Sequence, residues 1–182
     1  HAYFDWSLQA NLTKNIIIMT KLKHFLFTIF FLSIGIVKGY SYDFVTNGIY
    51  YNIISDTDKT VEVTYQNNYS KYSGDIVIPQ FVNYNNTQYQ VIRIGDYAFN
   101  SDDITSVKLP EGLQEIGHDA FYSCDALTNV ELPEGLISIG SMAFCSCDAL
   151  TNIELPNSLE YISSSAFRNC SLTSINLPNK IT

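Results

Sequence analysis

Four cysteines have the most versatile chemistry in this chain, because a thiol can act as a nucleophile, a metal ligand or half of a disulfide. Cys124, Cys147 and Cys170 recur every 23 residues, and Cys145 precedes Cys147 by two positions. We expect a column of thiols facing a core, since free cysteine is among the most buried residue types. One disulfide is an alternative if the chain is exported. Zinc is the other alternative, and it would need four convergent ligands.

Histidine limits the possible catalytic chemistry. His118 is the only histidine beyond residue 24, so a Ser-His-Asp or Cys-His site would have to use it. It falls at a variable position of a repeated segment, which favours a solvent-exposed loop side chain. Asp56-Thr57-Asp58 lacks the glycine and the distal glutamate of a calcium loop, so we expect a turn there. The sequence therefore predicts no catalytic residue, no metal site and no cofactor, and a protein that is not an enzyme.

The elements that must position these side chains are repeats. The chain has five prolines, each after an aliphatic residue, and the last four are spaced 23, 23 and 22 residues apart. A fixed period in the twenties is the sequence signature of a solenoid, in which stacked coils share one core. The columns that keep this period are Pro110, Pro133, Pro156 and Pro178, then Ile94, Ile116, Ile139 and Ile162, and finally Phe99, Phe121, Phe144 and Phe167.

The unit over residues 127–149, LTNVELPEGLISIGSMAFCSCDA, indicates how one coil is built. Alternation places Val130 and Leu132 on the core side of a short strand. Pro133 ends the strand because it cannot donate a ladder hydrogen bond, and the glycine after Ile139 suits a second bend. We therefore predict a parallel β ladder through one position of every coil. That ladder would join Val107, Val130, Ile153 and Ile175.

The strand positions that face away from this core form two polar rows. Flat sheets with rows of hydrogen-bonding side chains are where repeat proteins commonly bind, so we predict a binding surface there. The alternative is that the rows only keep the sheet soluble, because they lack the aromatic and arginine side chains of binding hot spots. The predicted binding residues are Ser106, Lys108, Asn129, Glu131, Asn152, Glu154, Ser174 and Asn176.

The string L-x-x-[IV]-x-L-P-x-x-L-x-x-I-G-x-x-A-F-x-x-C resembles the BspA-like leucine-rich repeats, also called the Treponema pallidum type. It covers residues 91–182 in four imperfect copies, with Ser163 in the glycine column and Asp102 in the cysteine column. The expected fold is mainly β: a leucine-rich-repeat-like right-handed solenoid with a parallel β ladder, preceded by a β-rich N-terminal cap and a signal-peptide helix. The resemblance also implies adhesion to host or neighbouring cells.

The start of the chain has the pattern of an export signal. After Met19, the first methionine, come a basic stretch, an apolar run over residues 25–37 and small residues at Gly39 and Ser41. This order is typical of a secretory signal peptide, and the run is short for a membrane span, which needs about 20 apolar residues. A retained membrane anchor is the alternative. We predict upstream or wrongly started sequence over residues 1–18, a signal peptide over 19–39, a cap over 40–90 and repeats over 91–182.

The predicted cap differs from the repeats in composition. Residues 40–90 hold nine of the 13 tyrosines and alternating runs such as KTVEVTY and GIYYNII, which predict strands. Pro79 falls in the proline column, so we expect a β-hairpin cap that merges into the first coil. Such caps protect the open core and strand edge of a solenoid.

The charge of the chain excludes one class of partner. The net charge is −8, and from Tyr40 onward six Lys or Arg residues stand against 17 Asp or Glu residues. A chain this acidic has no electrostatic footprint for nucleic acid or anionic lipid. We therefore expect no nucleic-acid partner, and contact with a membrane only through the export signal.

Two functions fit these observations. The first is a non-enzymatic secreted or cell-surface protein whose repeats bind proteins or cell-surface ligands adhesively. The second is the recognition module of a longer surface protein that carries a C-terminal hydrolase or glycan-binding domain. The sequence stops four residues after Pro178, in mid-coil, so we also expect further repeats or a cap beyond Thr182 and self-association through the open last coil.

Overall fold

The structure is a computed structural model that describes residues 42–65 and 72–181. The chain divides into two compact units, His1–Gly39 and Tyr40–Thr182, and every described residue belongs to the second unit. The predicted upstream segment and signal peptide lie outside the described residues.

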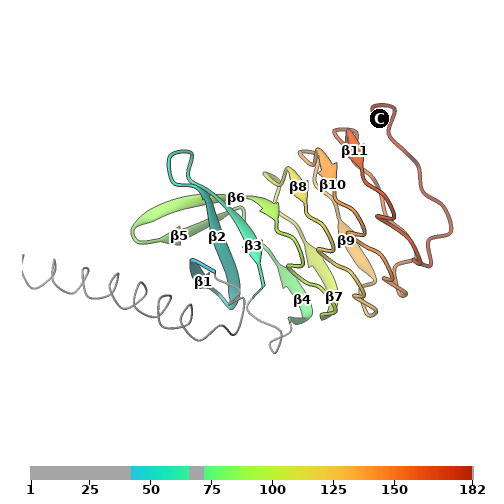
Figure 1. Cartoon of the computed structure of the whole chain (residues 1–182), viewed down its shortest axis with the longest axis horizontal. Coiled ribbons are helices and arrows are strands. Elements are labelled where there is room, and N and C mark those ends of the chain that lie inside the picture. The colour runs from blue at the N-terminus through green and yellow to red at the C-terminus, as the bar shows by residue number, and fades with distance from the viewer. Residues whose placement is uncertain (1–41, 66–71, 182) are drawn as a thin grey trace, which may run out of the picture. The chain divides into compact units, whose positions relative to one another are not determined.

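Strands make up all the regular structure of the described residues, which confirms the mainly β fold. An eight-stranded sheet has the order β1-β2-β3-β6-β8-β10-β11 with β5 paired to β6, and a three-stranded sheet has the order β4-β7-β9 (Figure 1). The strands are β1 (Phe44–Thr46), β2 (Ile49–Ser55), β3 (Thr60–Thr64), β4 (Ser73–Val77), β5 (Phe81–Tyr84), β6 (Thr87–Ile94), β7 (Asp103–Lys108), β8 (Glu115–Ile116), β9 (Asn129–Glu131), β10 (Ser138–Ile139) and β11 (Tyr161–Ile162).

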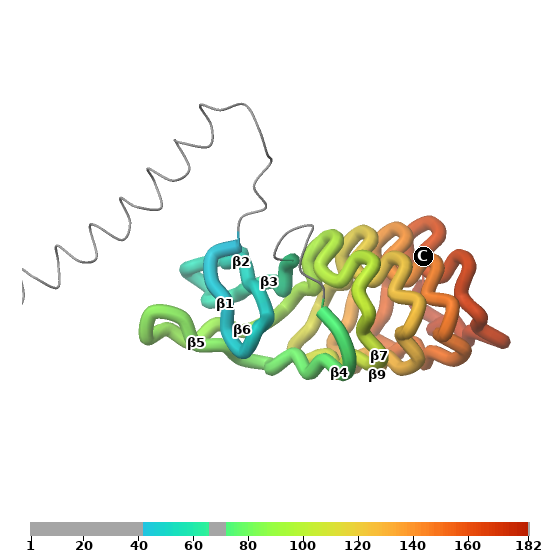
Figure 2. The backbone as a smooth tube through the Cα atoms, turned by 90° about the horizontal axis from the view of Figure 1, so that it is seen from below, coloured from blue at the N-terminus to red at the C-terminus, as the bar shows by residue number. Residues whose placement is uncertain are grey.

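The coils stack in register, as the backbone tube in Figure 2 shows. On the first side of each coil, β4, β7 and β9 form the predicted parallel ladder. Val107 pairs with Val130, and Ile76 of β4 pairs with Val107, so the segment before Pro79 joins the same ladder. The alternating burial of these strands follows from one apolar face that packs on the core and one face that meets water.

The ladder prediction is wrong for the later coils. Ile153 and Ile175 lie outside the strands, although Ile153 keeps its core position at 5% exposure while Ile175 is 36% exposed. The hydrogen bond from Thr173 N to Thr151 O is 3.4 Å long, against 3.0 Å from Thr128 N to Thr105 O. Bonds longer than about 3.2 Å are weak. On this side the later coils are therefore joined less tightly by their backbones.

The Ile-Gly segments, which the sequence marks only as bends, form a second parallel ladder. Ile94, Ile116, Ile139 and Ile162 pair in register across β6, β8, β10 and β11. A Cβ atom on Gly140 would lie 2.6 Å from the carbonyl carbon of the glycine in the preceding coil, so glycine lets the coils approach closely here. Strands of two residues are too short to show alternation, which is why the sequence does not reveal this sheet.

The third side of each coil is a stack of turns around the phenylalanine column. The rings of Phe99, Phe121, Phe144 and Phe167 are nearly parallel, with successive centroids 5.1, 5.0 and 5.4 Å apart. The amides of the first three donate to the alanine carbonyl of the next coil at 2.8, 2.7 and 2.8 Å. The turns therefore join neighbouring coils directly, without a strand.

The cap continues the second ladder. Strands β1, β2 and β3 form an antiparallel meander, and β3 pairs in parallel with β6 through Val61 and Val91. The ring of Phe44 stacks on Tyr84 at 4.5 Å. Strand β6 spans the predicted boundary at residue 90, so the aromatic cluster of the cap and the leucine-rich core belong to one continuous apolar interior.

Two turn positions in every coil adopt the left-handed backbone region, with φ between 52° and 61°. A side chain costs about 1–2 kcal/mol in this region, whereas glycine adopts it readily. The positions are Tyr97, Asp119, Met142 and Ser165, and then Ser101, Ser123, Ser146 and Asn169.

Ser123→Gly removes the cost of a side chain in the left-handed region, but glycine also loses more conformational freedom on folding. We expect the difference between these two effects to raise the free energy of unfolding by about 0.5–1 kcal/mol. Urea unfolding followed by circular dichroism measures the change. The matched control is Ser138→Gly in β10, which should lower stability because a strand does not need glycine. A destabilised Ser123→Gly chain would contradict the strain argument.

Candidate interaction surface

The first polar face consists of the eight predicted binding residues. Across β7 and β9, Ser106 pairs with Asn129 and Lys108 pairs with Glu131. Seven of the eight side chains are exposed, and Ser106 is half-buried. The structure thus brings the residues of β7 and β9 together as expected. Asn152, Glu154, Ser174 and Asn176 are exposed at equivalent positions that lie outside the strands.

Asp75 of β4 extends this face, and the sequence analysis missed it. It pairs with Ser106, and its Oδ1 accepts hydrogen bonds from the hydroxyls of Ser106 and Thr105, both at 2.7 Å. These two hydrogen bonds lower the pKa of the Asp75 carboxyl. Asp75 precedes Ile78-Pro79 by the same spacing that separates Ser106 from Leu109-Pro110, so the proline column contained the signal.

A column of exposed threonines runs beside the first polar face. The register shift between Gly74 and Asp75 leaves Thr105 without a strand partner, so Thr105 and Ser106 both face outward. The hydroxyl of Thr128 donates to the carbonyl of Thr105 at 3.1 Å. The sequence signal is a recurring Thr-Ser or Thr-Asn dipeptide. The column is Thr105, Thr128, Thr151 and Thr173.

The charge on the first polar face is mostly unneutralised. Glu131 and Glu154 form no ion pair with any residue that the structure describes. They occupy one column of successive coils, in which Lys108, the register partner of Glu131, is the one cation. A partner that supplies cationic groups would gain ion pairs with these two carboxylates.

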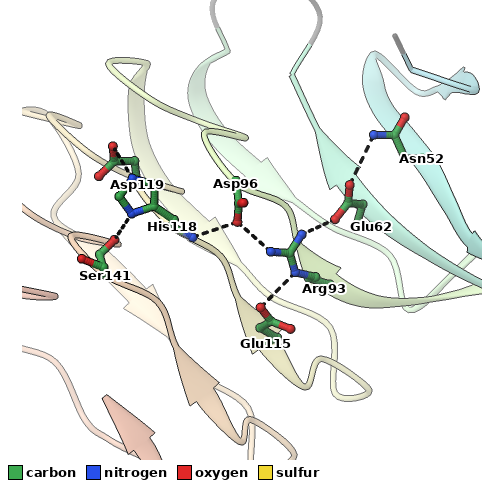
Figure 3. A network of polar contacts seen from close by, with 8 residues as sticks. All are labelled: Asn52, Glu62, Arg93, Asp96, Glu115, His118, Asp119 and Ser141. Carbon is green, nitrogen blue, oxygen red and sulfur yellow. Dashed lines mark hydrogen bonds and ion pairs between the residues drawn. The ribbon is translucent and has the colours of Figure 1, made fainter. Parts of the chain in front are cut away.

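A second polar face lies on the eight-stranded sheet (Figure 3). Glu62 of β3, Arg93 of β6 and Glu115 of β8 are paired in register, so one row of side chains crosses three strands. Arg93 forms ion pairs with Glu62, with Glu115 at 3.0 Å and with Asp96 at 2.6 Å. Asn52 of β2 lengthens the row by donating to Glu62 at 3.3 Å. The network joins the cap to the first two coils.

Arg93 has one guanidinium for three carboxylates. Its side chain is 24% exposed. Burial lowers the pKa of Arg93, but the hydrogen bonds with Glu62 and Glu115 and their charges outweigh burial, so the pKa lies above its usual value. The guanidinium is fully charged at any physiological pH, and a planar fork suits such multiple pairing.

We expect Arg93→Met to lower the free energy of unfolding by about 1–3 kcal/mol, because Glu62, Asp96 and Glu115 would lose their common counter-charge. Urea unfolding should show a smaller loss at high salt, where repulsion between the carboxylates is screened. Arg93→Lys should retain part of the stability. Arg168→Met is the control, and it should change stability little because Arg168 is exposed. Equal losses for Arg93→Met and Arg168→Met would refute the role of the network.

His118 is half-exposed and hydrogen-bonded, so its prediction as a solvent-exposed side chain holds only in part. Its Nδ1 donates to the Ser141 carbonyl at 2.9 Å, and its Nε2 lies 3.2 Å from Asp119 Oδ2. Burial raises the pKa of Asp119, His118 opposes this rise, and the charge of Asp96 adds to it. The Ser141 hydroxyl donates to the Ser164 carbonyl at 3.1 Å. It therefore does not donate its proton to His118, as the hydroxyl of a serine nucleophile would donate to its base.

The cysteine column lies in the core, and its described members form no disulfide. Cys124, Cys145 and Cys147 are buried, and Cys170 is half-buried. The column members donate to the phenylalanine carbonyl of the preceding coil: Cys124 to Phe99 at 3.0 Å, Cys147 to Phe121 at 3.1 Å and Cys170 to Phe144 at 2.9 Å.

Clusters of metal ligands and membrane-spanning helices are both absent from the described residues. Over residues 42–65 and 72–181, no group of three or more His, Cys, Asp or Glu side chains is placed to hold a metal ion. The Asp56-Thr57-Asp58 segment forms the predicted turn, in which Asp58 N donates to the Ser55 hydroxyl at 3.0 Å. Within the same described segments, no helix is long and apolar enough to cross a membrane.

Comparison with known proteins confirms the resemblance. No curated protein sequence matches the chain significantly. A leucine-rich repeat protein from Bacteroides ovatus is 34% identical with a TM-score of 0.71, over 78% of this chain and 37% of that protein. A leucine-rich repeat protein from Bacteroides capillosus is 32% identical with a TM-score of 0.65, over 76% of this chain and 97% of that protein. The leucine-rich repeat protein of T. pallidum is 26% identical with a TM-score of 0.56, over 74% of this chain and 71% of that protein.

The family comparison agrees with these structures. The BspA type leucine-rich repeat region, in six copies, matches residues 80–182, whereas the sequence pattern alone indicated four copies from residue 91. Strand β6 lies partly in the stretch that this match adds, and it pairs with β8 in the second ladder. The chain belongs to the BspA type leucine-rich repeat family.

Proposed function

We propose that this chain is a non-enzymatic, secreted or cell-surface repeat protein whose first polar face binds a protein ligand. The observation that carries the proposal is the register of β7 and β9, which sets exposed polar side chains of two successive coils in rows, together with Glu131 and Glu154, which form no ion pair within the described structure. Leucine-rich repeats are scaffolds for interaction, since stacked coils offer an extended surface.

Export is part of this proposal. Its support is the signal-peptide pattern over residues 19–39 and the acidity of the remaining chain, which suits a soluble extracellular surface. An adhesive role at the cell surface follows as the finer proposal, with a protein on a host or neighbouring cell as the ligand.

The ligand that fits the first polar face is a flat, basic protein surface. Glu131 and Glu154 can accept hydrogen bonds from lysine or arginine, and Asn129 and Asn152 can both donate and accept. Lys108 is the one cation among the eight residues, so it would set the register of an approaching partner.

The second polar face is less suited to this role. Its arginine is already bound to three carboxylates of the same chain, so a ligand would have to break those ion pairs. We assign it to stability.

Charge reversal tests the proposal. The chain would be assayed for binding to immobilised extracellular-matrix proteins and to whole bacterial cells, with and without Glu131→Lys plus Glu154→Lys. We expect binding to the detected ligand to weaken by about tenfold or more, because each lost charge-assisted contact contributes about 1.4 kcal/mol or more.

A matched variant controls for net charge. Glu111→Lys plus Glu134→Lys changes the charge equally at two exposed turn positions that lie outside the face. That variant should bind as the unmodified chain does. If both double variants bind equally well, or lose binding equally, the first polar face is not the binding surface.

The same face would also serve the alternative function, recognition within a longer surface protein that carries a hydrolase or glycan-binding domain. The full gene sequence distinguishes the two functions, because only the second requires such a domain.

A further inference from the structure

His118 and Asp119 connect three successive coils just after the second ladder. His118 N donates to Asp96 Oδ1 of the preceding coil at 3.0 Å, and Tyr97 N donates to His118 O at 2.9 Å. On the other side, the Ser141 carbonyl of the following coil accepts from Asp119 N at 3.1 Å and lies 2.9 Å from His118 Nδ1 (Figure 3). The two residues are therefore held from both neighbouring coils.

The contacts of the imidazole determine where its protons must be. A carbonyl oxygen can only accept, so Nδ1 carries a proton in its hydrogen bond to the Ser141 carbonyl. A neutral imidazole has one N–H, which leaves Nε2 as an acceptor. Nε2 lies 3.2 Å from Asp119 Oδ2, and an ionised carboxylate is also only an acceptor. A hydrogen bond between Nε2 and Oδ2 therefore needs one additional proton.

The surroundings of Asp119 favour that additional proton. Its side chain is 15% exposed, and its Oδ1 is buried without a hydrogen-bond partner among the described residues. Burial raises the pKa of this carboxyl, and the charge of Asp96 adds to the rise while His118 opposes it. A carboxylate with one unpartnered oxygen is costly to keep charged, and a proton shared with Nε2 lowers that cost.

The groups around the pair offer no cation in place of this proton. Within the described chain, no lysine or arginine forms an ion pair with Asp119. The guanidinium of Arg93 is already bound to three other carboxylates, those of Glu62, Asp96 and Glu115. The ring of Tyr97 meets the imidazole edge to face at 5.2 Å, and the facing groups of Ser141 in the following coil are uncharged.

We propose that His118 and Asp119 form a proton-dependent latch between coils, in which one shared proton closes the contact between Nε2 and Oδ2. In an unfolded chain the ordinary pKa values are about 6.5 for histidine and 3.9 for aspartate, so the unfolded chain releases this proton above about pH 6.5. The folded pair holds the proton more tightly. The latch therefore contributes stability that is fully present below about pH 6.5 and is lost as the pH rises.

The next coil suggests a variant that separates the latch from an ordinary hydrogen bond. Ser141 stands in the column of His118, and its hydroxyl donates to the Ser164 carbonyl at 3.1 Å, as His118 Nδ1 does to the Ser141 carbonyl. We therefore expect His118→Ser to keep a donor to the following coil while it removes Nε2.

Asp119→Asn is the complementary variant. An asparagine amide can donate to the Nε2 of a neutral imidazole, so the contact should persist without the additional proton. Asparagine also tolerates the left-handed backbone of residue 119, where φ is 52°. This variant should therefore fold normally and lose only the pH dependence of the latch.

Urea unfolding of the full chain at pH 6 and pH 8 tests the proposal. If the folded pair binds its proton about tenfold more tightly than the unfolded chain, the unfolding constant should rise about sixfold more between these pH values than in either variant, or about 1 kcal/mol. Other groups that titrate in this range, such as His1 and His24, are present in all three chains and cancel in the comparison.

Either variant decides the outcome by itself, provided that circular dichroism shows it to be folded at pH 6. Equal pH dependence in the unmodified chain and in Asp119→Asn would overturn the proposal. A His118→Ser chain that keeps the full pH dependence would overturn it as well, because that chain has no Nε2 to share the proton.

Discussion

Phe121→Ala is expected to lower the free energy of unfolding by about 3–5 kcal/mol, the usual cost of removing a buried phenylalanine side chain. The Phe121 ring is fully enclosed and stacks on Phe99 at 5.1 Å and on Phe144 at 5.0 Å. Both neighbouring rings are held by their own backbone hydrogen bonds to the next coil, so they cannot collapse into the space that the ring leaves. The cavity therefore persists and adds to the lost burial.

Urea unfolding measures this loss, and Phe167→Ala is the matched control. Phe167 belongs to the same column but is only half-buried, and within the described chain it stacks on one phenylalanine instead of two. We expect its replacement to cost less than half as much. Equal costs for the two substitutions would show that the stack does not stabilise the inner coils in the way we infer.

Gly117→Ala is expected to lower the free energy of unfolding by about 2–3 kcal/mol, in the upper part of the range for overpacked sites. A Cβ atom at this position would lie 2.8 Å from Asp96 N and 2.9 Å from the Gly95 carbonyl carbon. Both are backbone atoms of the preceding coil, so the coils themselves would have to separate. The separation would also disturb Asp96, whose carboxylate accepts from His118 N at 3.0 Å and pairs with Arg93.

Gly112→Ala is the matched control for this substitution. A Cβ atom there meets the amide end of the Gln90 side chain, which can swing aside. We expect no loss, or a small gain from the reduced freedom of the unfolded chain. Hydrogen exchange should add a local signature: Gly117→Ala should speed exchange at Gly140 N, which donates to Ile116 O at 2.7 Å, more than at Tyr51, which lies in the cap. Uniformly faster exchange throughout the chain would contradict a local separation of coils.

The sequence carried enough information for the solenoid and for the core, since the period of 22 or 23 residues repeats the same side-chain volumes in every coil. The phenylalanine, isoleucine and cysteine columns are all found where the period placed them, facing the interior. The exposed positions of the first polar face also follow from the alternation of a strand, which needs only neighbouring residues.

The tertiary structure alone decided the second ladder and the second polar face. Strands β8, β10 and β11 have two residues each, so no local alternation marks them, and only stacking of the coils supplies their hydrogen bonds. The Arg93 network needs Glu62, 31 positions earlier in the chain, to pair with Arg93 across β3 and β6. The shift between Val61 and Glu62 sets that register, and it arises where the cap meets the first coil.

The repeat period therefore determined by itself which side chains fill the core, because every coil must offer the next coil the same apolar surface. The period did not determine which polar side chains meet, since these depend on backbone pairing between segments that share no repeat pattern. Glu62 with Arg93 joins strand β3 of the cap to strand β6 of the first coil, and Asn52 with Glu62 extends that row further into the cap. Such contacts form only after the cap has folded onto the first coil, and this docking is a tertiary event.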